Sequence, residues 1–474
     1  CGRKRLPLNP LRVTVLHAYD ARKEERMYRR ALLALCLLTL SVAVALAQPH
    51  PLLSAGPMLG YAEMDETVIW VQTTQEATAQ IRYWQKGKPE TARLSEPIRT
   101  SRAGDHIALF RLSGLPFGTR FEYELYLNGE RVQRNYPLEF QTQPHWRWRT
   151  DPPEFTLVFG SCAYFNDPEV DRPGNPYGGE YEIFLAIHRL RPDLMLWLGD
   201  NIYYVEPDWL TEAGMRRRWR KSRQQPELQP LLASTHHYAI WDDHDYGPNN
   251  SDSSFRLKDV ALKVFADYFP QIRYGLPEAP GCFYRFEWGD VEFFMLDNRT
   301  YRSPNELQPS PQKQMLGRAQ LEWLKHSLRS SLATFKIIVC GGQMINPMVY
   351  FEGFGLFPEE QRELFDFIRR ERIPGVLFLS GDRHFGELLK VQREGCYPFY
   401  ELTASPLTAG PANGHPDEVN NPARVAGTWV RGKRHFGLIR VQGKRGERRL
   451  VLSLCDKEGK PFFEHVVTEQ ELRF

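Results

Sequence analysis

The stretch Leu194-Met-Leu-Trp-Leu-Gly-Asp-Asn-Ile-Tyr-Tyr204 decides how the rest of the chain is interpreted. It begins as a short apolar run, which is typical of a strand buried on both faces of a sheet. It ends in Gly199-Asp200, a turn that carries a carboxylate. Because ligands bind at the carboxyl ends of strands in open α/β sheets, we expect Asp200 to lie at a functional site. Tyr203 follows closely and can turn back toward the same centre.

The same arrangement, a strand followed by a polar cluster, recurs four more times along the chain. A single Gly-Asp turn after a strand is more often an ordinary turn, but five clusters indicate side chains that gather at one sheet edge. The other four are Gly160-Ser-Cys162, Trp241-Asp-Asp-His-Asp-Tyr-Gly-Pro-Asn-Asn250, Leu296-Asp-Asn-Arg-Thr-Tyr-Arg302 and Ser380-Gly-Asp-Arg-His384.

The densest cluster, from Trp241 to Asn250, contains three carboxylates, one histidine and two amides. Burying so many polar groups costs free energy that a hard cation offsets, because oxygen ligands suit such cations. The alternative is a solvated loop with Asx turns. Asp382 and His384 are two residues apart, so in extended backbone both side chains point the same way. A carboxylate beside an imidazole is a common pair of metal ligands, although His384 alone also fits an ordinary loop histidine.

Cys162 departs from this oxygen-rich pattern. A thiolate favours softer or redox-active metals such as iron or zinc. Beside the carboxylate of Asp200 and the phenol of Tyr203 it indicates ferric iron, since phenolate also ligates haem iron. The alternative is a buried structural cysteine.

Two arginines, Arg299 and Arg302, follow the strand that ends at Leu296. Guanidinium groups recognise phosphate oxygens through two parallel hydrogen bonds, but the same side chains also form ordinary ion pairs. Gln343 and Asn346 follow a further strand and offer amide contacts to the same cleft.

Residues 52–145 show the pattern of an all-β module. Alternating or short apolar runs at 68–71, 79–84, 107–112 and 121–126 are separated by turn residues. This spacing predicts a β-sandwich of fibronectin type III or immunoglobulin type. Nothing in it suggests catalysis, so its expected role is structural.

After a linker at 143–153, strands alternate with helices. We predict strands at 155–159, 194–198, 238–241, 335–340, 376–379 and 399–402, a hairpin of 282–288 with 291–296, and helices at 180–190, 318–331 and 358–372. Hairpins mixed with βαβ units predict an α/β fold of two packed sheets flanked by helices. The predicted division is therefore residues 1–47, 52–145 and 154–474.

Charge and the N-terminal segment limit the partners and predict export. The net charge is only +3, from 61 basic and 58 acidic residues, which argues against duplex nucleic acid as a partner. Basic residues after Met27, an apolar run at 31–45 and a cleavage site at Ala45-Leu-Ala47 predict a secretory signal peptide that starts at Met27. Arg29-Arg30 is a feature of twin-arginine signals, so both the twin-arginine and the general secretory route stay open, and a retained anchor is the alternative to cleavage.

The ordered motifs FGSC, LGDNIYY, WDDHDYGPNN, LDNRTYR, LGRAQLEWL and SGDRHFGEL resemble those of the alkaline phosphatase D (PhoD-like) family of metallophosphoesterases. Six motifs in order, over about residues 50–470, are far more specific than any one of them. The resemblance implies a metallophosphoesterase-type two-sheet αββα sandwich after the N-terminal β-sandwich. It implies a periplasmic, extracellular or cell-surface enzyme that hydrolyses phosphodiesters and phosphomonoesters. It also implies a centre of ferric iron and calcium, with zinc, manganese or magnesium as alternatives.

The site residues implied by this resemblance follow motif by motif. The choices between Asp242 and Asp243 and between Asn249 and Asn250 stay open. Arg383 is a departure, since many relatives have an apolar residue there, and its charge makes it a candidate for phosphate binding. The implied metal ligands are Cys162, Asp200, Tyr203, Asp243, Asn249, Asp382 and His384. The implied catalytic or phosphate-binding residues are His244 (also the proton donor), Arg299, Arg383 and Asp243.

We therefore predict hydrolysis by metal-activated water, with Asp200 bridging the ions. The expected partner of the monomeric chain is a phosphate ester, either a small molecule, a lipid or a teichoic-type polymer. One alternative is a phospholipase D-type lipid phosphodiesterase, in which Phe351, Phe354, Leu356 and Phe357 form a lipid-contacting lip; the same residues also fit a core. Another is a non-catalytic exported binding protein on the same fold.

Overall fold

The structure is a computed structural model that describes residue 2 and residues 50–474. Except for Gly2, the predicted upstream segment and signal peptide at 1–47 lie outside the described residues. Residues 51–132 and 136–474 form one compact unit. Within the described residues, no helix has both the length and the apolar character needed to cross a membrane.

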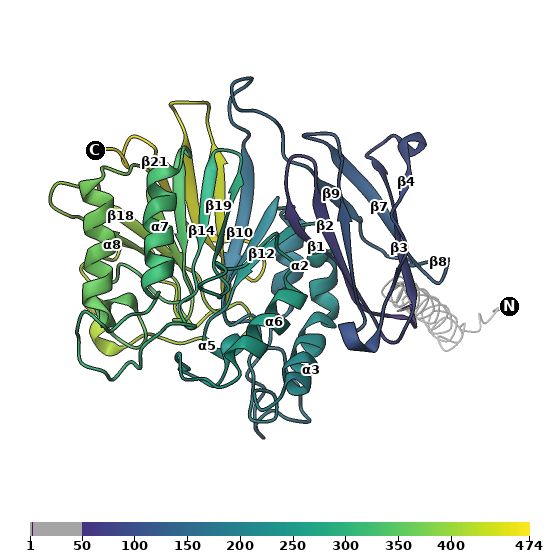
Figure 1. The fold of residues 1–474 in the computed structure, drawn as a ribbon, viewed down its shortest axis with the longest axis horizontal. Coiled ribbons are helices and arrows are strands. Elements are labelled where there is room, and N and C mark those ends of the chain that lie inside the picture. Colours follow the sequence, from purple (N-terminus) through teal and green to yellow (C-terminus); the bar gives the residue numbers. More distant parts are fainter. Residues whose placement is uncertain (1, 3–49) are drawn as a thin grey trace. The chain divides into compact units, whose positions relative to one another are not determined.

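The larger sheet has nine strands in the order β21-β20-β19-β10-β11-β12-β1-β2-β6 (Figure 1). Its centre is parallel and fully buried, as the apolar runs predicted, and β12 begins two residues before the predicted start. Its strands are β1 (Leu53–Ala62), β2 (Thr67–Thr73), β6 (Ile107–Leu112), β10 (Phe155–Gly160), β11 (Leu194–Leu198), β12 (His236–Ile240), β19 (His435–Gln442), β20 (Arg449–Asp456) and β21 (Pro461–Thr468).

A second sheet of six strands runs in the order β13-β14-β15-β16-β18-β17. The predicted hairpin of β13 and β14 is confirmed, with a two-residue turn whose Gly289 adopts the left-handed conformation at φ 58°. The two sheets pack face to face, and Tyr238 of β12 stacks on Phe286 of β13 with ring centroids 3.7 Å apart. The strands are β13 (Tyr284–Trp288), β14 (Val291–Met295), β15 (Phe335–Val339), β16 (Val376–Ser380), β17 (Glu387–Val391) and β18 (Phe399–Thr403).

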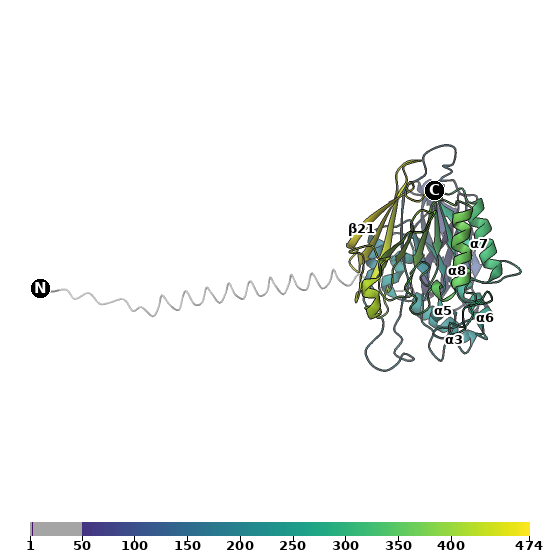
Figure 2. The ribbon, with the colours of Figure 1, turned by 90° about the vertical axis from the view of Figure 1, so that its left-hand side faces the viewer.

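Helices flank the two sheets. The predicted helices α2 (Glu182–Arg189), α7 (Arg318–Ser330) and α8 (Pro358–Arg370) are confirmed, and the stripe Leu321, Leu324 and Leu328 of α7 is buried. Helices α7 and α8 lie side by side, and Figure 2 shows them on the side of the molecule away from β21. Among the described residues, the other α-helices are α3 (Glu212–Arg223), α4 (Gln229–Leu232), α5 (Asp243–Tyr246) and α6 (Lys258–Tyr268).

The N-terminal module is a β-sandwich, as predicted. One layer is β1-β2-β6, and the other is a sheet of β3 (Thr78–Gln85), β4 (Arg93–Leu94), β5 (Ile98–Arg99), β7 (Arg120–Leu127), β8 (Glu130–Arg131) and β9 (Glu139–Gln141). The inward residues of both layers form a separate apolar core that includes Leu59, Ile69, Ile81, Phe110 and Leu125.

The sandwich and the following α/β region share a sheet, which the sequence analysis did not anticipate. Strand β1 pairs in parallel with β12, with Leu59 opposite His236. The backbone N–H of Ala62 donates to the hydroxyl of Tyr238 at 3.0 Å. The boundary drawn at residues 145–154 therefore separates the two regions along the chain but not within the sheet.

Candidate metal centre

The polar clusters predicted from the sequence meet at one end of the two sheets. The loops after β10, β11, β12 and β16 leave the carboxyl ends of parallel strands. They line a cavity of about 630 Å³, together with the segments around Phe351 and Asn413. Its lining includes Asp200, Asp243, His244, Asn250, Asp382 and His384.

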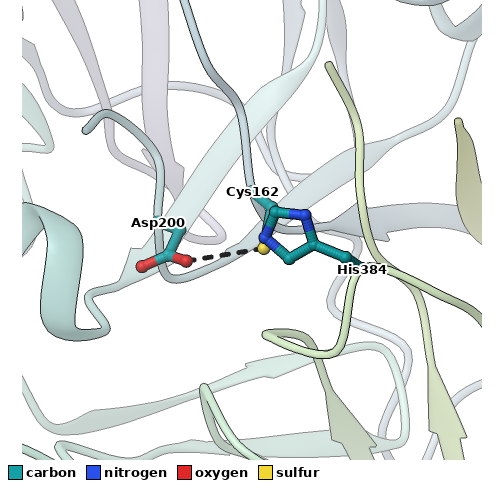
Figure 3. A group of neighbouring side chains, drawn as sticks. All are labelled: Cys162, Asp200 and His384. Atoms are coloured by element: carbon teal, nitrogen blue, oxygen red, sulfur yellow. Dashed lines mark hydrogen bonds between the residues drawn. The ribbon is translucent and has the colours of Figure 1, made fainter. Parts of the chain in front are cut away.

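Four side chains with metal-ligating atoms converge at the base of this cavity. Cys162, Asp200 and His384 each present one such atom, and all three atoms lie within 4.8 Å of one another (Figure 3). The Cys162 Sγ lies 3.4 Å from Asp200 Oδ2. The hydroxyl of Tyr203 lies 3.2 Å from the same Oδ2 and 3.1 Å from His384 Nε2. The loops after β10, β11 and β16 thus bring together a thiol, a carboxylate, a phenol and an imidazole.

The ring orientation of His384 leaves one nitrogen for the centre. Its Nδ1 lies 2.5 Å from the carbonyl oxygen of Gly410, which only accepts hydrogen bonds. The proton therefore resides on Nδ1, and Nε2 presents its lone pair toward Tyr203, Cys162 and Asp200. A hydrogen bond of this kind fixes the tautomer of metal-ligating histidines.

The surroundings of Cys162 define its protonation state in the metal-free protein. Burial raises the pKa of the thiol to about 12, against hydrogen bonds with Ser161, Ser405 and Tyr203 that lower it. The Ser405 hydroxyl donates to Sγ at 3.0 Å. The thiol is therefore protonated at neutral pH unless a cation is present to stabilise the thiolate.

A second group consists of Asp200, Asp243 and His244, which also present ligating atoms within 4.8 Å of one another. The backbone N–H of His244 donates to Asp200 Oδ1 at 3.2 Å, and that of Asn250 donates to Asp243 Oδ2 at 2.7 Å. The His244 ring stacks on Tyr203 with centroids 4.1 Å apart. Asp200 belongs to both groups and lies between them.

The carboxylates of the site crowd one another. Burial and the charges of Asp243 and its neighbours raise the pKa of Asp200 well above its usual value. Burial and the charges of Asp242 and Glu352 raise the pKa of Asp382 to about 7. Burial alone would also raise the pKa of Asp243, but His244 and Arg299 hold it below its usual value. Bound cations would reduce the electrostatic repulsion within such a cluster of carboxylates.

The backbone at these residues is strained. Cys162, Asp200, Asn250, Asp382 and His384 all adopt left-handed conformations, with φ between 50° and 64°. Such conformations cost about 1–3 kcal/mol each for residues other than glycine and concentrate at functional sites. The surrounding fold therefore holds the predicted ligands in orientations that the loops alone would not favour.

Comparison with known proteins identifies the family. A sequence model described as PhoD-like phosphatase matches residues 157–452, which is more than half of the chain. The chain belongs to the PhoD-like phosphatase family. A second model, described as a domain of unknown function (DUF7800), matches residues 50–145.

Individual relatives of this PhoD-like phosphatase agree with the family model. Alkaline phosphatase D of Bacillus subtilis (strain 168) is 23% identical over 279 residues, covering 49% of this chain and 46% of the relative. The chain thus spans about half the length of this curated relative. A solved structure of PhoD has a TM-score of 0.71 at 17% identity and covers 88% of this chain and 89% of that one. Purple acid phosphatase PPD1 from yellow lupin (Lupinus luteus) seeds has a TM-score of 0.59 at 12% identity, covering 87% and 74%. Both structures share with this chain a metallophosphoesterase-like fold of two packed sheets.

The residues of this PhoD-like phosphatase fit the metal ions that the family implies. Cys162, Asp200, Tyr203 and His384 would hold one ion, and Asp200 with Asp243 would hold a second beside it. The Nδ1 of His244 is buried without a hydrogen-bond partner among the described residues. The mixed sulfur, nitrogen and oxygen donors of the first group differ from the oxygen-rich second group.

The structure separates the three aspartates of the 241–250 cluster. Asp243 lines the cavity, whereas Asp242 accepts hydrogen bonds from Asn298 and Arg299 behind it. Asp245 is the third residue of helix α5, and its carboxylate accepts a hydrogen bond from the backbone N–H of the N-cap residue Asp242. The geometry therefore favours Asp243 over Asp242. Asn249 and Asn250 both line the cavity, and the backbone of Asn250 is bonded to Asp243.

The predicted phosphate-binding arginines both pair with carboxylates in this structure. Arg299 is fully buried and pairs with Asp242 and with both carboxylate oxygens of Glu352, at 3.1 and 2.7 Å. Arg383 reaches the cavity lining, but its Nη2 is bound by Glu418 at 2.8 and 2.9 Å. Both guanidinium groups thus neutralise internal carboxylates, and their contact with phosphate stays a prediction.

Two residues take the core alternative that the sequence left open, and further contacts at the site were not predicted. Phe354 and Phe357 of the predicted lipid-contacting lip are fully buried, and of that set only Phe351 is largely exposed. Tyr177, Ser405 and Gly410 contact the predicted ligands but stand in no polar cluster after a predicted strand. Tyr177 lies in the segment Pro173-Gly-Asn-Pro-Tyr177, where nothing in the pattern signals a functional role.

Proposed function

We propose that this PhoD-like phosphatase is a metal-dependent hydrolase of phosphate esters. The observation that carries the proposal is the convergence of Cys162, Asp200, Tyr203 and His384 beside Asp243 and His244 at one cavity. In the reaction, a water oxygen forms a bond to phosphorus, the bond from phosphorus to the ester oxygen breaks, and a proton passes to the departing alcohol. Bound metal ions would lower the pKa of water and neutralise phosphate charge.

The residues of the chain provide positioning and proton transfer. Asp200 would join the two metal positions, since its carboxylate belongs to both groups. His244 lines the cavity above Tyr203, where its imidazole can contact a phosphate oxygen or pass a proton to the leaving oxygen. Arg299 holds Asp242 from behind the site and is a positioning residue.

The proposed metals are ferric iron in the first position and calcium in the second. Thiolate, phenolate and imidazole are donors that suit iron, whereas carboxylate and amide oxygens suit calcium. Zinc, manganese or magnesium are the alternatives. We further propose that the chain is exported, on the basis of the predicted signal peptide, and acts outside the cytoplasm.

Elemental analysis of the purified protein, with hydrolysis of bis(p-nitrophenyl) phosphate before and after chelation, tests this proposal. We expect bound metal and activity that chelators remove. If ferric iron is present, Tyr203→Phe should remove the phenolate-to-iron part of the visible charge-transfer absorption. Cys162→Ser should lower metal content and reduce kcat by about 100-fold or more.

The matched control is Cys282→Ser, because Cys282 is also buried but belongs to neither group of metal-ligating side chains. It should keep metal content and activity. Zinc or manganese in an active protein would contradict the iron assignment but keep the hydrolase. A protein without metal or activity, even when supplied with these ions, would refute the proposed function.

A further inference from the structure

Two aromatic side chains are exposed at the rim of the candidate metal centre. Phe351 is 65% exposed and Tyr177 is 45% exposed, and both line the cavity. Large apolar side chains lose free energy when they face water, so aromatic rings gathered at a polar cavity suggest that a ligand covers them. The Phe351 ring has no contact with the metal ligands that the proposed mechanism requires, whereas the Tyr177 hydroxyl also contacts His384.

Phe351 is held in place although its ring is exposed. The preceding Tyr350 donates its hydroxyl to Asp417 at 2.6 Å and stacks on His415 with centroids 4.2 Å apart. The following Glu352 is bound by Arg299. Phe351 itself adopts a left-handed conformation with φ 58°, which is unusual for a bulky residue. Anchors on both sides thus impose a conformation that exposes the ring.

The Phe351 ring packs on a charged side chain that is itself held in place. The guanidinium of Arg383 lies 5.0 Å from the ring centroid and 4.9 Å from that of Phe385. Because Glu418 holds Arg383, the ring has a rigid support. A ring that is already ordered loses little conformational entropy when a ligand stacks on it.

The side chain of Tyr177 is ordered by contacts with Tyr164 and with His384, the residue after Arg383. Its hydroxyl lies 3.4 Å from His384 Nδ1, and its ring meets Tyr164 edge to face with centroids 5.0 Å apart. Gly410 lies flat against this ring, since a Cβ at Gly410 would come within 2.7 Å of it. The two rings therefore contact adjacent residues, Arg383 and His384, of the loop that carries a candidate ligand.

The charges of the lining restrict what can lie against these rings. Glu306 and Asp382 line the cavity, whereas the charges of Glu352 and Arg383 are balanced by Arg299 and Glu418. A substituent with additional negative charge would be repelled there. A neutral planar group is not repelled by these charges and can stack on the aromatic rings. Stacking of this kind is favourable for any planar group.

We propose that Phe351 and Tyr177 bind the ester group of the substrate and that this group is a neutral planar aromatic ring. The inference rests on the proposed function and specifies its substrate class. It predicts that esters of aromatic groups bind more tightly than esters of simple alkyl or acyl-chain alcohols, because alkyl groups stack less favourably on aromatic rings. Phe351 is the sharper probe, because Tyr177 also contacts His384.

The test uses two diesters with the same leaving group, p-nitrophenyl phenyl phosphate and p-nitrophenyl ethyl phosphate. Wild-type protein should hydrolyse the phenyl ester with the higher kcat/KM. Phe351→Ala should lower kcat/KM for the phenyl ester by about tenfold, mainly through KM, and leave the ethyl ester within about twofold. Phe351→Trp should retain the preference, and Phe351→Leu should lose most of it. Trp148→Ala is the matched control, since Trp148 is 80% exposed and is not part of the cavity lining.

The outcomes distinguish this inference from the function on which it rests. Equal kcat/KM for the two esters, or an equal effect of Phe351→Ala on both, would overturn the inference and keep the hydrolase. A preference for the ethyl ester would point to an alkyl or lipid substrate instead. Hydrolysis of neither ester, with phenylphosphonate bound no better than methylphosphonate in titration calorimetry, would overturn both proposals.

Discussion

Arg383 lies between two predicted metal ligands, Asp382 and His384, and its charge is balanced by a residue 35 positions away. The carboxylate of Glu418 receives two hydrogen bonds from Arg383 Nη2, and both side chains are almost fully buried. Buried charges are costly to desolvate unless they are paired, so each of these groups requires the other. The pair also supports the Phe351 ring through the guanidinium. A residue predicted to bind phosphate thus holds the loop in place.

Replacing Glu418 by Gln should therefore destabilise the protein. The change keeps the side-chain shape but leaves the Arg383 charge buried without a counter-charge, which we expect to lower the free energy of unfolding by about 3 kcal/mol. Urea denaturation at neutral pH measures it. Glu359→Gln is the control, because Glu359 pairs with Arg362 on an exposed helix surface and should change stability by no more than about 0.5 kcal/mol. Equal losses in the two variants would contradict this account of Arg383.

At the scale of elements, the end of each central strand determines the site. Strand β11 ends at Leu198, and Gly199 then turns the chain so that Asp200 faces the centre. Gly199 has φ 88°, and a Cβ there would lie 2.5 Å from Asp242 Cβ and 2.7 Å from Asp242 N. Glycine is therefore required at position 199 for two reasons: its positive φ and the close approach of the loop after β12.

The variant Gly199→Ala should be strongly destabilised. Left-handed strain and overlap with backbone atoms together should cost roughly 3 kcal/mol or more, and metal content should fall because Asp200 shifts. Gly87→Ala separates the two causes: Gly87 has φ 76° but no atom within 4 Å of the added Cβ, so only the strain of about 1 kcal/mol applies. Unfolding free energies in urea provide the comparison. If Gly87→Ala cost as much as Gly199→Ala, close packing would not be the reason for the glycine.

The same elements show what the sequence could predict. Strands β10, β11, β15 and β16 were predicted within one residue because continuous apolar runs signal burial on both faces. Helix α3 was missed because its buried face includes Arg216, Arg218 and Arg223, which remove the apolar periodicity. Of the predicted ligands, Cys162, Asp200 and His384 come together as expected because strand ends share an edge, whereas Asn249 and Asp382 line the cavity but belong to neither group. The partners Glu352 and Glu418 were missed because pairing across a fold leaves no trace in local spacing.

At the scale of the whole compact unit, the β-sandwich is joined to the α/β region by more than the pairing of β1 with β12. Asp105 from the sandwich is buried against Arg216 and Arg220 of α3 and accepts a hydrogen bond from Tyr268 of α6 at 2.6 Å. The Trp70 indole donates to the carbonyl of Asp267 at 2.9 Å. Removing the sandwich would expose the edge of β12 and remove the carboxylate that pairs with Arg220, so the two regions should fold as one cooperative unit.

Asp105→Asn tests this cooperativity. Asparagine tolerates the left-handed φ of 53° at this position, so the change removes mainly the charge that balances the two arginines. We expect a loss of about 2 kcal/mol that lowers the unfolding midpoint of both regions together. Hydrogen exchange measured on peptides from 53–73 and from 194–240 across a denaturant series reports the regions separately, and their transitions should coincide in wild type and variant. Glu76→Gln, in an exposed pair with Arg99, should leave the midpoint unchanged. Two separate transitions, with Asp105→Asn shifting only that of the sandwich, would mean that the shared sheet joins two independently stable domains.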